Sequence, residues 1–77
     1  MEKFLNEIEL RWGAYPRRIV QSELKSKGYI PRRFRRRNVL KSTVVVDNGD
    51  GTLSFKEEFL NDIANVAKTL GVKIDII

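Results

Sequence analysis

The sequence predicts a small α+β domain, and three observations support that class. Apolar side chains in the first 27 residues are spaced as in helices, and two β-branched or aromatic segments flank a polar turn. Residues 56–70 then show a strong amphipathic helical pattern. We expect the 77 residues to form one domain spanning 1–77, because the 42% apolar content is enough for a single small core.

Two helices are expected at the start of the chain. Residues 2–12 place their apolar side chains on one helical stripe, and Gly13 follows as a stop. The second helix is predicted over 16–27, with Pro16 at its first position and Gly28 as its left-handed end. The stripe of the first helix consists of Phe4, Leu5, Ile8 and Trp12.

A hairpin, a helix and a closing strand are expected in the second half. The run TVVV (43–46) and the segment TLSF (52–55) flank the turn DNGDG, and we expect TVVV to lie at the centre of the sheet. Ser54 and Glu57 have the spacing of a capping box for the helix at 56–70. The alternating segment 72–76 predicts a last strand, and the helix becomes a crossover if that strand joins the same sheet.

Residues 31–41 carry the densest charge in the chain. The segment PRRFRRRNVL places arginine at five of the six positions 32–37, with Phe34 as the sixth. Arginine favours helices and Pro31 is suited to a helix start, so we expect a short helix here. In this interpretation Phe34 anchors the segment against the first two helices and directs the arginines outward.

Charge is distributed unevenly along the chain. The formal net charge is +5. Residues 1–43 hold 12 Lys and Arg against 4 Asp and Glu, a net +8, whereas residues 44–77 hold 3 against 6, a net −3. A basic half of this kind predicts one face for an anionic partner.

Several function classes are disfavoured by composition. There is no His and no Cys, so the commonest general base, thiolate chemistry and the usual zinc ligands are missing. We therefore expect no enzymatic activity, no cofactor and no metal. No apolar run approaches the roughly 20 residues of a membrane span. The expectation is a cytoplasmic protein without a membrane partner.

The segment DNGDGTLSFKEE (47–58) partly resembles a calcium-binding EF-hand loop. Placing Gly51 at loop position 6 puts Glu57 at position 12, but position 1 then falls on Val46, which cannot coordinate an ion. The preceding residues also favour a strand over the helix that such a loop needs. A hairpin turn is the preferred interpretation.

Residues 20–40 resemble a helix-turn-helix DNA-binding motif. The apolar and glycine positions of that family fall on Leu24, Gly28, Ile30 and Phe34. The resemblance implies a second helix that reads DNA, and the hairpin at 43–55 resembles the wing of a winged-helix domain. By analogy, it implies a regulator of transcription or recombination.

The arginines themselves favour recognition of nucleic acid. Their planar fork binds phosphates and guanine edges bidentately, and so many charges cannot be buried without partners. The phosphate-contact candidates are Arg17, Arg18, Arg36 and Lys41, the groove-contact candidates are Arg32, Arg33 and Arg35, and Arg37 completes the patch.

Duplex DNA is favoured over RNA as the partner, because Phe34 is the single aromatic residue within the basic patch. Three alternatives stay open. The arginines pair with the acidic second half, the chain is a protein-interaction module or inhibitor docking on an acidic partner, or the basic residues bind anionic lipid. A homodimer formed through the strand at VKIDII is a further possibility.

Overall fold

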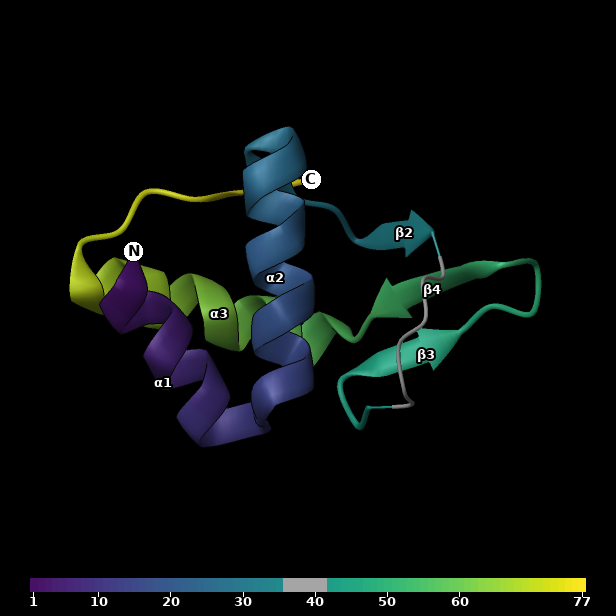
Figure 1. The fold of residues 1–77 in the computed structure, drawn as a ribbon, viewed down its shortest axis with the longest axis horizontal. Helices are drawn as coiled ribbons and strands as arrows, with labels where there is room; N and C mark the ends of the chain where they lie inside the picture. The colour runs from purple at the N-terminus through teal and green to yellow at the C-terminus, as the bar shows by residue number, and fades with distance from the viewer. Residues whose placement is uncertain (36–41) are drawn as a thin grey trace.

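The computed structural model describes residues 1–35 and 42–77 and confirms the α+β class. Three helices pack together, and a three-stranded sheet extends from them to one side (Figure 1). The elements are α1 (Glu2–Trp12), α2 (Ala14–Lys27), β1 (Tyr29–Ile30), β2 (Arg33–Arg35), β3 (Val45–Asp47), β4 (Thr52–Phe55), α3 (Glu57–Leu70) and β5 (Asp75–Ile76).

The first two helices form where the sequence predicts them. Helix α1 has the predicted bounds, whereas α2 begins at Ala14, two residues before the expected Pro16. Pro16 still lies in the first turn, where its missing N–H has no helical acceptor. Gly28 ends α2 in the left-handed conformation (φ 75°) and donates its N–H to the Leu24 carbonyl at 2.9 Å.

Strand β4, and not the valine run, lies at the centre of the larger sheet. The strand order is β2-β4-β3, with both neighbours antiparallel to β4. The prediction of a central TVVV was therefore wrong. Leu53 and Phe55 of β4 are buried, whereas the valine run buries Val44, leaves Val46 47% exposed and pairs with β4 on one side only.

The short helix predicted over 31–41 is wrong for its described part, because Arg33–Arg35 form strand β2. Arg33 and Arg35 are exposed and Phe34 between them is only 5% exposed, which is the period-two alternation of a strand. The predicted second helix of a helix-turn-helix motif is therefore absent from 33–35. Arg36, Arg37 and Lys41 lie outside the described residues.

The closing strand does not join the hairpin sheet. It is shorter than predicted and pairs in parallel with β1, so that α3 is not a crossover within the larger sheet. Arg32 links the two sheets through its backbone. Its N–H donates to the Ile77 carbonyl at 2.7 Å, and its carbonyl accepts the Phe55 N–H at 2.9 Å.

Helix α3 supplies the broadest apolar face to the core. It starts at Glu57 after Lys56, and no side chain caps it, so the capping box predicted for Ser54 was wrong. The ring of Phe55 lies 4.7 Å from that of Phe34 and 5.2 Å from that of Phe59, measured between centroids. One hydrophobic cluster thus joins the sheet to the helices. Phe34 is buried as expected, but its aromatic partner is in β4.

Candidate nucleic-acid interface

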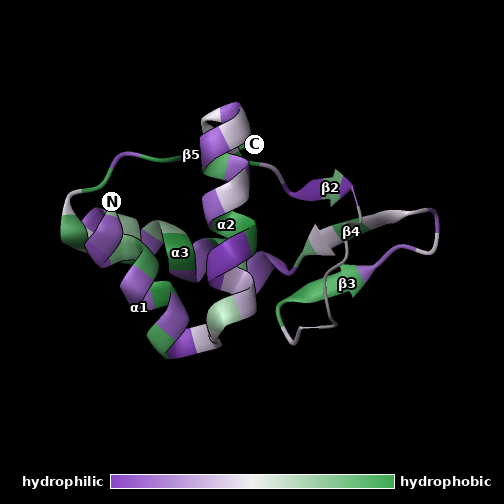
Figure 2. Ribbon diagram, in the orientation of Figure 1, coloured by the Kyte–Doolittle hydropathy of each residue, from purple (hydrophilic) through white to green (hydrophobic). Residues whose placement is uncertain are grey.

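The outer face of the three-stranded sheet brings two arginines beside two hydroxyl groups. In the antiparallel register, Arg33 lies opposite Ser54 and Arg35 lies opposite Thr52. Directly opposed residues point to the same side of a sheet. Because the Phe34–Leu53 pair points into the core, both arginines and both hydroxyls point outward. Figure 2 shows β2 as a mostly hydrophilic strand beside β4.

Arg33 is held by the hairpin turn. Its Nε donates to Thr52 Oγ1 at 3.0 Å, and its Nη2 pairs with the carboxylate of Asp50. The Asn48 amide donates to Thr52 Oγ1 at 3.0 Å and to Ser54 Oγ at 2.9 Å. These contacts fix the direction of the Arg33 guanidinium on the surface.

The carboxylate of Asp50 is stabilised in its charged form. The hydroxyl of Thr52 donates to it, the Thr52 backbone N–H donates at 3.1 Å, and the Arg33 guanidinium lies beside it. Together these contacts hold the pKa of Asp50 below its ordinary value, the Thr52 hydroxyl having the largest effect. Arg33 therefore faces a full negative charge at neutral pH.

Among the described residues Arg35 has no acidic partner, unlike Arg32 and Arg33. It is exposed, and no ion pair engages it among the residues that the structure describes. It lies two residues from Arg33 on the same face of the strand. This guanidinium is open to an external anion.

Arg32 has a largely structural position. Its guanidinium pairs with the carboxylate of Glu57 in the first turn of α3, while its backbone joins both sheets. The side chain of Arg32 is 56% exposed, so the pair is a surface one. Of the three predicted groove contacts, the structure thus groups Arg33 and Arg35 on one face and ties Arg32 to α3.

The two predicted phosphate contacts on α2 lie apart from the sheet face. Arg17 reaches to Glu9 of α1 at 3.3 Å, and its side chain is only 24% exposed. The Arg18 guanidinium carbon lies 6.0 Å from the centroid of the Tyr15 ring. Within residues 1–35 and 42–77, no ion pair or hydrogen bond connects either arginine to the sheet.

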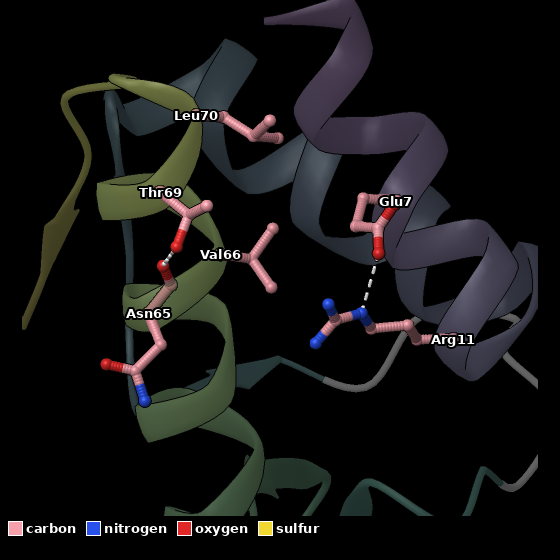
Figure 3. Close-up of a pocket in the computed structure, with 6 residues that line it drawn as sticks. All are labelled: Glu7, Arg11, Asn65, Val66, Thr69 and Leu70. Carbon is pink, nitrogen blue, oxygen red and sulfur yellow. Dashed lines mark hydrogen bonds and ion pairs between the residues drawn. The ribbon is translucent and has the colours of Figure 1, made fainter.

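A groove between α1 and α3 is a weaker candidate (Figure 3). It has a volume of about 260 Å³, and Arg11 extends across it toward α3. Arg11 Nε already donates to Glu7 Oε1 at 2.7 Å, and no second cation lines the described groove. Because the carboxylate of Glu7 neutralises the guanidinium, this groove is poorly suited to a phosphate.

Sequence reasoning missed the polar half of the sheet face. The alternation in TLSF places Thr52 and Ser54 on one side, so that signal was present in the sequence. The alignment of β2 with this strand was not evident, because the pairing is non-local and joins residues 17 to 21 positions apart in the chain. Pairing of the arginines with the acidic second half was one of the open alternatives, and the structure shows it at Arg33–Asp50 and Arg32–Glu57. Which acids take part was not evident, for the same reason.

Comparison with protein-family models, curated proteins and solved structures gives no match to this chain. Within the described ranges, no helix has both the length and the apolar character required to cross a membrane. The same ranges contain no group of three or more acidic side chains arranged to hold a metal ion.

Proposed function

We propose that this chain binds nucleic acid without catalysis, using the outer face of the β2-β4-β3 sheet. The observation that carries the proposal is the adjacency of Arg33 and Arg35 on one exposed face, opposite the hydroxyls of Ser54 and Thr52. Guanidinium groups and hydroxyls are among the side-chain donors that contact phosphate oxygens. The Thr52 hydroxyl donates to Asp50, whereas the Ser54 hydroxyl accepts from Asn48 and keeps its own proton for a phosphate. A rigid sheet presents them without a large entropic cost, because Phe34 anchors the strand in the core.

Ion pairing on this face is compatible with binding. Arg33 and Asp50 are 60% and 50% exposed, so their pair is well solvated and contributes little to stability. A polyanion also gains from release of its counterions when it meets arginine. A phosphate can therefore replace Asp50 as the partner of Arg33, while Arg35 needs no such exchange.

Duplex nucleic acid, with DNA preferred, is the partner we favour. Proteins that hold single strands stack bases on exposed aromatic rings. The two aromatic residues of β2 and β4, Phe34 and Phe55, point into the core and are each 5% exposed. The described sheet face thus offers phosphate donors but no stacking surface, which suits a continuous duplex backbone.

Fluorescence anisotropy with a labelled duplex, measured over a range of salt concentrations, tests the proposal. Arg35→Ala should weaken binding and reduce the slope of log K against log salt by about 0.9, the value for one lost phosphate contact. Lys25→Ala, which removes an exposed cation from α2, is the matched control and should change both quantities less.

Two outcomes contradict the proposal. One is the absence of duplex binding at low salt, and the other is an equal effect of Arg35→Ala and Lys25→Ala. A labelled single strand of the same length is compared in parallel, and tighter binding to it would overturn the duplex preference. Circular dichroism of each variant shows whether the fold is retained, so that loss of binding is assigned to the surface.

A further inference from the structure

Strand β5 pairs along one edge only within the described chain. In the described chain, β5 has one strand neighbour, β1, so its other edge is open. Ile77 at its end is 65% exposed. Figure 2 shows that the segment leading into β5 alternates hydrophobic and hydrophilic residues. An open edge with this pattern is a template for another strand.

The pairing with β1 determines which peptide groups face the open edge. Ile77 donates its N–H to the Ile30 carbonyl at 3.0 Å and accepts the Arg32 N–H. Successive residues of a strand direct their peptide groups to opposite edges. Ile76 and Ile74 therefore direct theirs away from β1, toward a new partner.

The charged side chains of this segment form no ion pair with another described residue. Lys73 and Asp75 are exposed, and the described structure gives neither of them an ion pair. Val72, Ile74 and Ile76 alternate with them and pack partly against the core. The segment thus has one apolar side and one side bearing a cation and an anion two residues apart.

We propose that this edge binds a second copy of the same chain, by antiparallel pairing across a two-fold axis at Ile74. In that register Ile74 of one chain exchanges both backbone hydrogen bonds with Ile74 of the other, through an N–H and a carbonyl that bond to no other described residue. Lys73 then lies opposite Asp75 of the second copy, and the same pair forms a second time by symmetry. The proposal is independent of nucleic-acid binding.

The charges of Lys73 and Asp75 favour this register over those in which the two-fold axis is moved by one residue. Moving the axis to Asp75 places two aspartates opposite each other, and moving it to Lys73 does the same with two lysines. Like charges directly opposite destabilise a strand pair, whereas opposite charges stabilise it. The sequence of this strand is therefore complementary to itself in one antiparallel register.

A groove beside β5 provides space for the incoming strand. It has a volume of about 430 Å³ and lies between the segment 72–76 and α3. Ala64 and Ala67 form part of its α3 wall, and their small side chains permit close approach. Apolar side chains of the second copy would cover Ala64, which is exposed in the single chain.

Sedimentation velocity over a range of protein concentrations tests the proposal, using protein freed of nucleic acid. Lys73→Glu and Asp75→Lys should each raise the dimer dissociation constant roughly tenfold or more, since two attractive pairs become repulsive. The double exchange Lys73→Glu/Asp75→Lys should restore the original value. Lys25→Glu, with the same charge change on α2, should leave the value nearly unchanged.

A chain that stays monomeric at every concentration overturns the proposal. So does a double exchange that fails to restore association while circular dichroism shows a native fold. Ile74→Pro provides a second test, because proline removes an N–H at the open edge and none that bonds to β1. Association that persists in folded Ile74→Pro would place the interface elsewhere.

Discussion

The guanidinium of Arg33 in β2 pairs with the carboxylate of Asp50, which lies 17 residues later in the turn between β3 and β4. This contact joins the basic half of the sequence to its acidic half on the surface proposed to bind nucleic acid. It reduces the positive charge of that surface and orients Arg33 at the same time. The pair therefore links the electrostatics of the face to the geometry of the hairpin.

Replacing Asp50 should strengthen nucleic-acid binding, if the proposed function is correct. Asp50→Asn keeps an acceptor oxygen for Thr52 but removes the charge that competes with phosphate for Arg33. We expect affinity for a duplex at low salt to rise about two- to tenfold. Asp62→Asn on α3 makes the same change in net charge and should have a smaller effect. Equal gains for both variants would show that only net charge matters.

Asp50 should also contribute to acid sensitivity. Its pKa is lowered in the folded chain, chiefly by the Thr52 hydroxyl, so its contribution to stability is present above the unfolded pKa. That contribution is lost as the pH falls below about 4 and through the folded pKa. Urea unfolding between pH 2 and 6 should show a shallower loss of stability for Asp50→Asn. Identical pH profiles for both proteins would contradict this.

Phe34 should be essential for the sheet face. It is 5% exposed and its ring packs on Phe55, so Phe34→Ala should cost about 3–5 kcal/mol of unfolding free energy. In a domain of this size, that loss is a large part of the total stability. Phe34→Leu should cost less, and Arg35→Ala, at the exposed neighbouring position, about 0.5 kcal/mol or less. Urea denaturation followed by circular dichroism gives all three values.

Glu23 is the buried charged residue of the described chain, and we expect Lys27 to stabilise its carboxylate. Glu23 is 3% exposed, and its Oε2 lies 3.5 Å from Lys27 Nζ without hydrogen-bond geometry. Lys27→Met should therefore destabilise the fold by about 1–3 kcal/mol, because the carboxylate loses its counter-charge. Lys25→Met on the same helix is the control. Glu23→Leu should be neutral or stabilising, and a large loss of stability in that variant would refute this view of the pair.

Local chemistry was enough to predict the helices and the hairpin. Glycine stops and apolar stripes placed α1, α2 and α3 to within two residues, because helical hydrogen bonds connect positions four apart. The turn 47–51 was equally evident from its Asn-Gly and Asp-Gly pairs. The burial of Phe34 followed from its place among arginines, which cannot enter a core without partners.

Strand pairing could not be predicted from local sequence patterns. The basic segment contains good helix formers, yet Arg33–Arg35 is a strand, because β4 offers a free edge and the core accepts Phe34. The pairing of β1 with β5 connects residues more than 40 positions apart, and no local pattern specifies it. The candidate arginines could therefore be named from the sequence. Which of them share a face, and which have acidic partners, depends on non-local hydrogen bonds and ion pairs that exist only once the sheet has formed.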